Sequence, residues 1–372
     1  MSKKTTLNII LVGGGTAGSV SPLLAVKDAV LKLEPNTKFY FFGTRSGTEK
    51  ILVEKENLKF YSIPAGKWRR YFSIRNFFDI FLVLFGFIRS LYLLRKIKAD
   101  IVLSAGSFVS VPVSFAAFIL RKKIFLHQQD LLPSFSNKLI FPFANKLSVS
   151  LEESQRNFSN ESGFFKKIKK QSKIIYTGNP VRANITSGNR KRALKEFGLE
   201  SNFPTILVLG GSSGAATINK LILESIGELT KYFQVIHVIG KHKVRSVKNI
   251  DHYHPYDFLT ANLPDAFKIA DIVVSRAGFS TITELSACKK VSVIIPMPKS
   301  HQIANANYLF FKRAAVAIRQ ETLNPKLLIT FLRKLLFDYK LQILLRENIA
   351  NLMPVNASEK LAKQLITLVK NV

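Results

Sequence analysis

Asn8-Ile-Ile-Leu-Val-Gly-Gly-Gly-Thr-Ala-Gly18 decides the fold, because it joins a short apolar run to a cluster of glycines just ahead of a helical pattern over 22–33. Thr205-Ile-Leu-Val-Leu-Gly-Gly-Ser-Ser-Gly-Ala215 repeats this layout ahead of a second helical pattern over 217–229. A buried strand, a glycine turn and a helix start open each half of a nucleotide-binding α/β fold. The repetition predicts two doubly wound, Rossmann-like α/β domains in tandem.

Other short runs of Val, Ile, Leu and Phe lack polar alternation, which predicts parallel strands covered on both faces. We expect such strands at 38–42, 101–104, 124–127, 146–150, 235–239, 272–275 and 291–296, and helix after residue 325. We predict a boundary near Gly178-Asn-Pro180, with a first domain over 1–180 and a second over 181–345. The helical segment 346–372 is expected to pack back on the first domain.

Charge is the outlying property of the composition. The 372 residues include 55 Lys and Arg against 24 Asp and Glu, a formal net charge of +31. Such a charge attracts nucleic acid or anionic lipid, although a general bias toward Lys explains it equally well. The single cysteine, Cys288, excludes a disulfide within the chain and fits a reducing cytosol. The apolar run after Lys3-Lys4 is short and ends in glycines, so we expect a first strand there and not a signal peptide.

The glycine loops indicate which ligands are possible. Gly13-x-Gly15-x-x-Gly18 matches the dinucleotide fingerprint, but Phe42-Gly-Thr-Arg45 lacks the acid that holds the ribose of a nicotinamide cofactor. The glycines would still let a phosphate or sugar approach backbone amides, or would simply form a tight turn. In the second loop, the helix N-terminus and the hydroxyl of Ser212 favour a diphosphate.

Polar residues follow two later strands. In Ser275-Arg-Ala-Gly-Phe-Ser-Thr-Ile-Thr-Glu284, the carboxylate of Glu284 is suited to accept both hydroxyls of a ribose. The alternative is a capping box that joins Ser280 or Thr281 to Thr283 or Glu284. Gln302 and Asn305 lie three residues apart, so they share a helix face beside a strand end where ligands collect.

These motifs together resemble the MurG family of peptidoglycan glycosyltransferases over most of the chain. The similar segments follow the family order: Gly14–Pro22, Ser107–Pro112, His127–Asp130, Gly178–Arg182, Gly210–Ala215, Ser275–Glu284 and Gln302–Ala306. The resemblance implies the GT-B fold, with an active site in the cleft between domains. It also implies transfer of N-acetylglucosamine (GlcNAc) from UDP-GlcNAc to undecaprenyl-pyrophosphoryl-MurNAc-pentapeptide, which converts lipid I into lipid II.

The same resemblance assigns residues to the donor. Glu284 would bind the ribose, Gln302 the sugar, and the backbone near Leu259–Thr260 the uracil, while Ser212 and Arg182 would contact the diphosphate. The full set expected near the donor is Thr16, Ala17, Gly18, Asp130, Arg182, Ser212, Thr260, Phe279, Ser280, Thr281, Ile282, Thr283, Glu284, Gln302 and Asn305. The expected reaction inverts the anomeric carbon and needs neither a cofactor nor a metal.

The chain departs from the family pattern at two motifs. The family usually has Gly-Gly-His where this chain has Ala17, Gly18 and Ser19, and a neutral serine cannot act as a base near pH 7. The family's His-Glu-Gln-Asn motif is here His127-Gln-Gln-Asp130. We therefore expect Asp130 to act as the base, and His127 to be structural.

A membrane contact is expected between Lys67 and Lys98, which include eight basic residues and the single acid Asp79. The apolar part is marginal for spanning a bilayer of ~30 Å, and an interfacial helix that also packs on its domain fits better. Peripheral binding at the cytoplasmic face is the expected location, with other cell-wall enzymes as further partners. The residues expected to meet anionic lipid are Trp68, Arg69, Arg70, Phe77, Phe78, Phe81 and Phe85.

Three rival functions remain open at this point. A glycolipid synthase would use the same donor with diacylglycerol as acceptor. A sugar-nucleotide-binding subunit without catalysis is suggested by Ser19. A nucleic-acid binder is suggested by charge alone, and because no recognition motif supports it, we expect no nucleic-acid partner.

Overall fold

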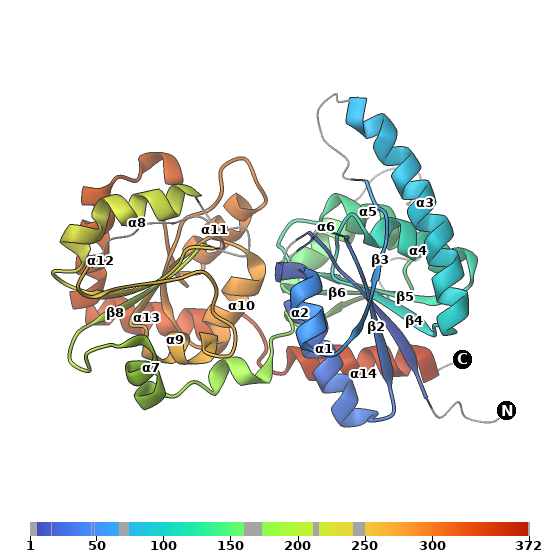
Figure 1. The fold of residues 1–372 in the computed structure, drawn as a ribbon, viewed down its shortest axis with the longest axis horizontal. Coiled ribbons are helices and arrows are strands. Elements are labelled where there is room, and N and C mark those ends of the chain that lie inside the picture. The colour runs from blue at the N-terminus through green and yellow to red at the C-terminus, as the bar shows by residue number, and fades with distance from the viewer. Residues whose placement is uncertain are drawn as a thin grey trace. The chain divides into compact units, whose positions relative to one another are not determined.

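The computed structural model describes residues 6–15, 17–45, 47, 49–66, 74–159, 173–210, 216–240 and 250–370, with the backbone alone at 17, 74–78 and 159. The chain divides into two compact units (Figure 1). The first unit comprises residues 1–182 and 354–372, and the second comprises residues 183–353. The chain thus passes from the first unit to the second after Arg182 and returns to the first after Met353, whereas the boundaries predicted from the sequence lie after residues 180 and 345.

The first unit contains a parallel sheet whose described strands run in the order β3-β2-β1-β4-β5-β6-β7. Ile10 of β1 lies opposite Tyr40 on one side and Val102 on the other. The order reverses between β1 and β4, and ligands of doubly wound sheets bind outside the carboxyl ends at such a point. The strands are β1 (Asn8–Val12), β2 (Lys38–Gly43), β3 (Lys59–Ser62), β4 (Ile101–Ser104), β5 (Lys123–Gln128), β6 (Lys146–Val149) and β7 (Ile174–Tyr176).

Helices cover both faces of this sheet. On one face Leu23 and Leu361 join the core, and on the other Leu94 and Val113 do so. The helices are α1 (Ser21–Leu33), α2 (Glu49–Lys55), α3 (Ile74–Ile97), α4 (Ser110–Ile119), α5 (Phe135–Ile140), α6 (Arg156–Ser159) and α14 (Ala357–Lys370), with 3-10 turns η1 (Ala17–Ser19), η2 (Phe141–Phe143) and η3 (Glu152–Gln155). The strands are apolar on both sides because each side is buried.

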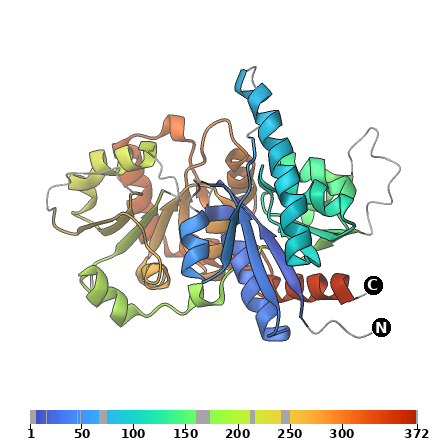
Figure 2. The ribbon, with the colours of Figure 1, turned by 45° about the vertical axis from the view of Figure 1, so that its right-hand side comes forward.

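The C-terminal helix α14 belongs to the first unit. It lies beside α1 in both ribbon views (Figures 1 and 2), and Leu361, Ala362 and Leu365 are fully buried there. The Ser358 hydroxyl donates to the carbonyl oxygen of Val181 at 3.0 Å. The chain therefore leaves and re-enters the first unit at neighbouring points.

The second unit repeats the architecture with the described strand order β10-β9-β8-β11-β12-β13. The strands are β8 (Thr205–Leu209), β9 (Gln234–Val238), β10 (Tyr253–Tyr256), β11 (Ile272–Ser275), β12 (Val291–Ile294) and β13 (Val316–Ala317). The helices are α7 (Arg190–Phe197), α8 (Ala216–Leu229), α9 (Leu263–Ile269), α10 (Phe279–Ala287), α11 (Gln302–Phe311), α12 (Pro325–Phe337) and α13 (Tyr339–Ala350), with 3-10 turns η6 (Ala183–Thr186) and η7 (Gln320–Thr322). Here the order reverses between β8 and β11.

The structure confirms the predicted fold class of two parallel-sheet α/β domains. The interior strands and the helices after the two glycine loops lie close to their predicted bounds. Strands β3, β7, β10 and β13 were not predicted, and all four lie at the ends of the strand orders. β3 and β10 mix polar and apolar residues, and β7 and β13 are only three and two residues long, so none of the four has the long apolar run of an interior strand.

Candidate functional site

Helix α10 begins at the point where the strand order of the second unit reverses. It starts at Phe279, directly after β11, and Gly278 is its N-cap residue. Ser280 and Thr281 lie inside the helix and not at its N-cap, so the capping-box alternative for this segment is not what the structure contains. Thr283 instead donates its hydroxyl to the Phe279 carbonyl oxygen at 2.8 Å, within the helix. The site hypothesis for Glu284 therefore loses its main structural rival.

Glu284 lies one and a half turns into α10 and keeps part of its side chain at the surface. Burial raises the pKa of this carboxyl group to about 7. Among the described residues, no side chain forms a hydrogen bond or ion pair with the carboxyl oxygens. A carboxyl group in such surroundings can accept hydrogen bonds from a ligand's hydroxyl groups without first breaking a contact within the protein.

The other residues of α10 expected at the donor divide by exposure. Ser280 and Thr281 are partly exposed, whereas Phe279, Ile282 and Thr283 are buried. Thr260 is exposed, and its backbone N–H donates to Asn262 Oδ1 at 3.1 Å. Ser212 lies outside the described residues.

Gln302 and Asn305 of α11 turn out to differ in surroundings. Asn305 is buried, and its amide donates to the Ala277 carbonyl oxygen at 3.0 Å, which ties α11 to the turn before α10. Gln302 is partly exposed, and its Oε1 accepts a hydrogen bond from the Met297 N–H at 3.0 Å. Asn305 therefore holds α11 against the turn before α10, while part of Gln302 stays open to solvent.

Arg276 was not expected to belong to the site. Its guanidinium donates to the carbonyl oxygens of Ile295 and Pro296, both at 3.1 Å, and to Gln320 Oε1 at 2.7 Å. It thereby joins the loops that follow β11 and β12 at the carboxyl edge of the sheet. The available signal was its position directly after a short strand of Ile and Val that ends in Ser275, since a charged side chain beside a buried strand needs specific partners.

The first glycine loop lies at the carboxyl end of β1. Gly15 is exposed and has φ +88°, a backbone conformation that side chains rarely adopt. The Ser19 hydroxyl is buried and donates to the Gly14 carbonyl oxygen at 3.5 Å. Ala17 and Gly18 form the turn η1 with Ser19, while Thr16 lies outside the described residues. Ser19 thus supports the loop from within.

His127 links two of the motifs found in the sequence. Its Nε2 is 2.7 Å from Asn179 Oδ1, and its Nδ1 is 2.8 Å from Ser148 Oγ. Because Asn179 Oδ1 can only accept, Nε2 carries the proton and Nδ1 accepts from the serine. Burial lowers the pKa of His127 to about 4. The expected structural role of His127 agrees with this arrangement.

Gln128 and Asp130, which follow His127 in the same motif, differ in how deeply they are buried. The Gln128 side chain is buried and donates to the carbonyl oxygens of Asp130, at 2.9 Å, and Leu132, at 2.8 Å. It also accepts a hydrogen bond from Asn137 at 2.8 Å. Asp130 is only partly buried, so its carboxyl group lies nearer to solvent than Gln128. Gln128 shapes the turn that presents Asp130.

Arg182 is engaged with acidic residues in this structure. Its Nη1 is 2.8 Å from Glu56 Oε1, and its Nε is 3.8 Å from Asp28 Oδ2. Lys27 binds the other oxygen of Glu56 at 2.8 Å. Burial would raise the pKa of Glu56, but Lys27 and Arg182 outweigh it and hold the pKa below its usual value.

Helix α3 presents one apolar face to solvent. Its exposed side chains include Ile80, Phe81, Leu84, Phe85, Ile88 and Tyr92. On the opposite face Leu93 and Leu94 are buried, and a Cβ added at Gly86 would lie 1.9 Å from the Pro64 carbonyl oxygen. The helix thus packs on its unit with one face only. In the portion of the chain that the structure covers, we find no helix with the length and apolarity to cross a membrane.

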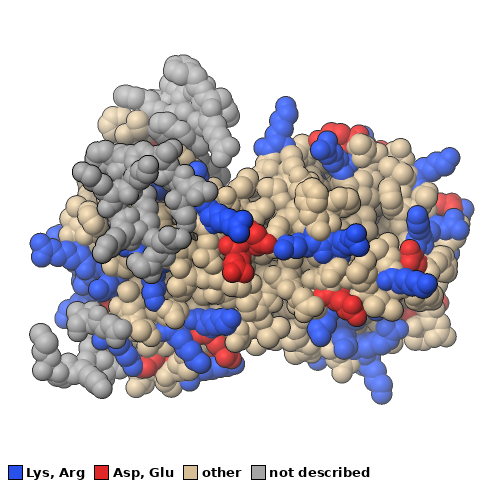
Figure 3. Space-filling model, turned by 180° about the vertical axis from the view of Figure 1, so that it is seen from behind, with Lys and Arg blue, Asp and Glu red and all other residues tan. Residues whose placement is uncertain are grey.

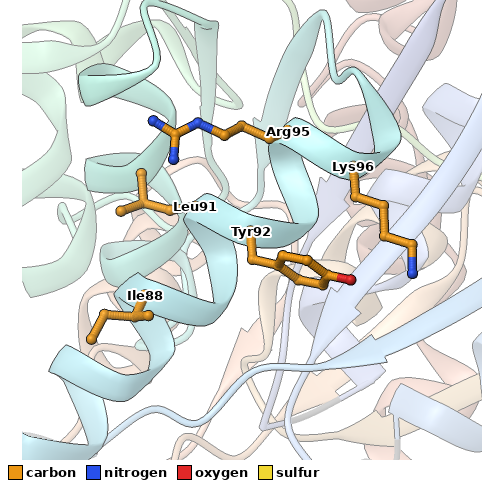
Figure 4. Close-up of a pocket in the computed structure, with 5 residues that line it drawn as sticks. All are labelled: Ile88, Leu91, Tyr92, Arg95 and Lys96. Atoms are coloured by element: carbon orange, nitrogen blue, oxygen red, sulfur yellow. The ribbon is translucent and has the colours of Figure 1, made fainter.

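The C-terminal part of α3 combines apolar and basic side chains. Ile88, Leu91, Tyr92, Arg95 and Lys96 line a shallow pocket (Figure 4). The ammonium group of Lys96 lies 5.5 Å from the centre of the Tyr92 ring. Elsewhere, Lys and Arg side chains are scattered over the visible face of both units (Figure 3). Trp68, Arg69 and Arg70, and the side chains of Phe77 and Phe78, lie outside what the structure describes.

Among the described residues, no three His, Cys, Asp or Glu side chains lie close enough together to hold a metal ion.

Residues 9–149 match the model of the glycosyltransferase family 28 N-terminal domain, and residues 205–365 match that of its C-terminal domain. Two parallel-sheet α/β units, matched in this way, define a glycosyltransferase of the GT-B type.

Named relatives narrow the class further. The UDP-N-acetylglucosamine–N-acetylmuramyl-(pentapeptide) pyrophosphoryl-undecaprenol N-acetylglucosamine transferase 2 of Bacillus cereus is 36% identical over 332 residues, 88% of this chain and 91% of that protein. The enzyme of the same name from Clostridium perfringens is also 36% identical, over 88% of this chain and 89% of that protein. The crystal structure of Acinetobacter baumannii MurG superposes with a TM-score of 0.68 at 21% identity, covering 98% of this chain and 100% of that one. The chain belongs to the MurG family of glycosyltransferases, which confirms the family and the enzyme class inferred from its motifs.

Proposed function

We propose that this enzyme transfers GlcNAc from UDP-GlcNAc to the C4 hydroxyl of the muramyl sugar in undecaprenyl-pyrophosphoryl-MurNAc-pentapeptide. The names of relatives at 36% identity support this choice of donor and acceptor. The observation that carries the donor assignment is the carboxyl group of Glu284, which stands without a described partner at the switch point of the second sheet. The chemistry of a ribose, two adjacent hydroxyl donors, matches the two acceptor oxygens of a carboxylate.

The remaining proposed donor contacts are Gln302, Thr260 and Ser212 of the second unit, together with Arg182 of the first unit. Gln302 contacts the transferred sugar, and the backbone at Thr260 meets the uracil. Ser212 and Arg182 contact the diphosphate, and Arg182 exchanges the carboxylate of Glu56 for it. A guanidinium fits a phosphate through paired hydrogen bonds, whereas Arg182 contacts Glu56 through Nη1 alone, and its Nε has no hydrogen-bond partner among the described residues.

The reaction is a single displacement at the anomeric carbon. The C4 oxygen of the acceptor forms the new bond, the bond to the diphosphate breaks, and UDP leaves with the electron pair, so the configuration inverts. Asp130 takes the proton from the C4 hydroxyl. His127 is unsuited to this step, because its protonated nitrogen donates to Asn179 and the other accepts from Ser148.

The negative charge that develops on UDP needs stabilisation by the protein. Arg182 and the N-terminus of α8 supply it, and we propose that no metal ion is needed. Turnover that is unchanged in excess EDTA is expected, whereas a strict requirement for added Mg²⁺ would contradict this part of the proposal.

We further propose that the exposed face of α3 lies in the cytoplasmic surface of the membrane, where the lipid-linked acceptor is found. Phe81 and Phe85 would enter the acyl boundary, and Arg95 and Lys96 would meet anionic headgroups. Phe81→Asp with Phe85→Asp should reduce flotation with vesicles that contain phosphatidylglycerol. Phe337→Asp, at an exposed residue of the second unit, is the matched control.

The function itself is tested by titration and by turnover. UDP-GlcNAc should bind saturably, and a short-chain lipid I analogue should be glycosylated while diacylglycerol is not. Turnover on diacylglycerol would favour the glycolipid synthase. Donor binding without turnover on either acceptor, unaffected by Asp130→Asn, would favour a non-catalytic binding subunit.

A further inference from the structure

Glu49 begins helix α2, and its side chain is fully buried at the carboxyl edge of the first sheet. Its Oε1 accepts hydrogen bonds from the Thr44 backbone N–H, at 2.9 Å, and from the Thr44 hydroxyl. Its Oε2 is buried and has no hydrogen-bond partner among the residues that the structure describes. An unsatisfied buried oxygen costs about 1–3 kcal/mol, so the fold gains less from this residue than from an apolar one of similar size.

Glycines from two neighbouring loops close on this carboxyl group. A Cβ added at Gly14, after β1, would lie 3.0 Å from Glu49 Oε1. A Cβ added at Gly43, at the end of β2, would lie 3.2 Å from Glu49 Cγ, and one at Gly47 would lie 1.7 Å from Oε2. Strands β1 and β2 pair in parallel, so their loops leave the sheet at the same edge. Glu49 therefore stands between the loops and fills the space that the missing side chains leave.

The loop that Glu49 supports is the one with an exposed backbone. Gly15, with its φ of +88°, faces solvent one residue beyond Gly14. Ser19 holds Gly14 through its carbonyl oxygen, while Glu49 Oε1 lies where it would crowd a side chain added at the same residue. The two contacts fix the backbone just before the segment that can meet a ligand.

We propose that Glu49 is a positioning residue for the acceptor, which holds loop 13–15 in the shape that receives the muramyl diphosphate. The inference rests on the proposed function, in which Asp130 and the exposed face of α3, both in the first unit, meet the acceptor. Glu49 acts through Thr44 and Gly14 and does not touch the substrate, because its carboxyl oxygens are buried. Pre-shaping a binding loop lowers the ordering cost of association, so its loss weakens binding of the ligand that the loop receives.

Glu49→Gln keeps the size of the side chain and is the first test. The KM for a short-chain lipid I analogue should rise about tenfold, equivalent to one well-placed hydrogen bond, while the dissociation constant of UDP-GlcNAc stays within about twofold. Gly47→Ala should have the same selective effect, since its methyl group displaces the carboxyl. Gly227→Ala is the matched control, because a Cβ there meets nothing within 4 Å.

Hydrogen exchange supplies a readout that does not depend on turnover. Amides of 13–15 and 43–45 should exchange faster in Glu49→Gln, while amides of the second unit keep their wild-type rates. Unchanged exchange in those segments, or equal losses of donor and acceptor affinity, would overturn the proposal. If Glu49→Gln does not fold, Thr44→Val takes its place, and a wild-type acceptor KM and exchange in that variant would also overturn it.

These outcomes separate the inference from the function on which it rests. If even the wild-type enzyme fails to use the lipid I analogue, the proposed function fails, and the exchange rates alone then decide whether Glu49 shapes the loop. If the wild-type enzyme turns over and Glu49→Gln matches it in KM and exchange, only the inference fails.

Discussion

Donor binding should depend on pH through the carboxyl group of Glu284. Burial raises the pKa of Glu284 to about 7, and ribose hydroxyl groups donate to the ionised form. Donor binding therefore favours loss of the proton, and the affinity follows the ionised fraction of the free enzyme. That fraction is about nine-tenths at pH 8 and about one-tenth at pH 6, so the dissociation constant of UDP-GlcNAc should rise roughly tenfold between them.

The perturbation that isolates this effect is Glu284→Gln. The amide can still accept one hydrogen bond but cannot ionise, so we expect weaker binding at pH 8, by about 10- to 100-fold, and almost no pH dependence. His127 and His237, whose pKa values burial lowers to about 4, do not titrate in this range. Glu224→Gln, at a half-exposed residue of α8, is the matched control and should keep the wild-type profile.

Isothermal titration calorimetry in two buffers of different ionisation enthalpy measures both the affinity and the protons released. Wild-type enzyme should release close to one proton per donor bound at pH 6 and almost none at pH 8. A variant Glu284→Gln that retains the wild-type pH dependence and proton release would refute the assignment of the ribose to this carboxyl group.

Three further predictions concern stability and the charged cluster. Glu284→Gln should raise the Tm above pH 7, because the raised pKa of Glu284 means that its ionisation disfavours the folded state. The gain in Tm should shrink as the pH falls from about 7 toward 4.5, the ordinary pKa of the group. Differential scanning fluorimetry at several pH values measures this trend. Glu56→Gln should free Arg182 and strengthen UDP-GlcNAc binding by about threefold. In a double-mutant cycle, Arg182→Ala should abolish this gain in affinity. An unchanged affinity in Glu56→Gln would show that the ion pair does not compete with the donor. Gly178→Ala should lower stability by about 1–3 kcal/mol in urea denaturation, because its φ is +82° and a Cβ would lie 2.8 Å from Pro354 Cδ; a wild-type midpoint would contradict this account.

The glycine loops and the interior strands illustrate what could be predicted from the sequence. Asn8–Val12 and Thr205–Leu209 are apolar on both sides and run directly into glycines, a local pattern with one common structural meaning. Edge strands such as Lys59–Ser62 are only partly covered, and their mixed composition does not distinguish them from loops. Pairing with a neighbour far along the chain, which no local pattern records, makes them strands.

The features of the candidate site likewise divide into those that follow from local sequence and those that depend on the folded chain. The position of Glu284 near the start of a helix after a strand follows from its segment alone, as does the expectation of a ligand at that edge. The pairing of Arg182 with Glu56, the inward turn of Asn305 toward Ala277 and the raised pKa of Glu284 depend on residues brought together by folding.

By itself, the amino-acid sequence determined the two α/β units, the order of their loops and the residue types at each strand end, because strand, turn and helix preferences act over a few neighbouring residues. Only the tertiary structure decided which of those residues remain open to a ligand. Burial and charge pairing depend on distances between segments such as those that contain Glu56 and Arg182, and spacing along the chain carries no record of those distances.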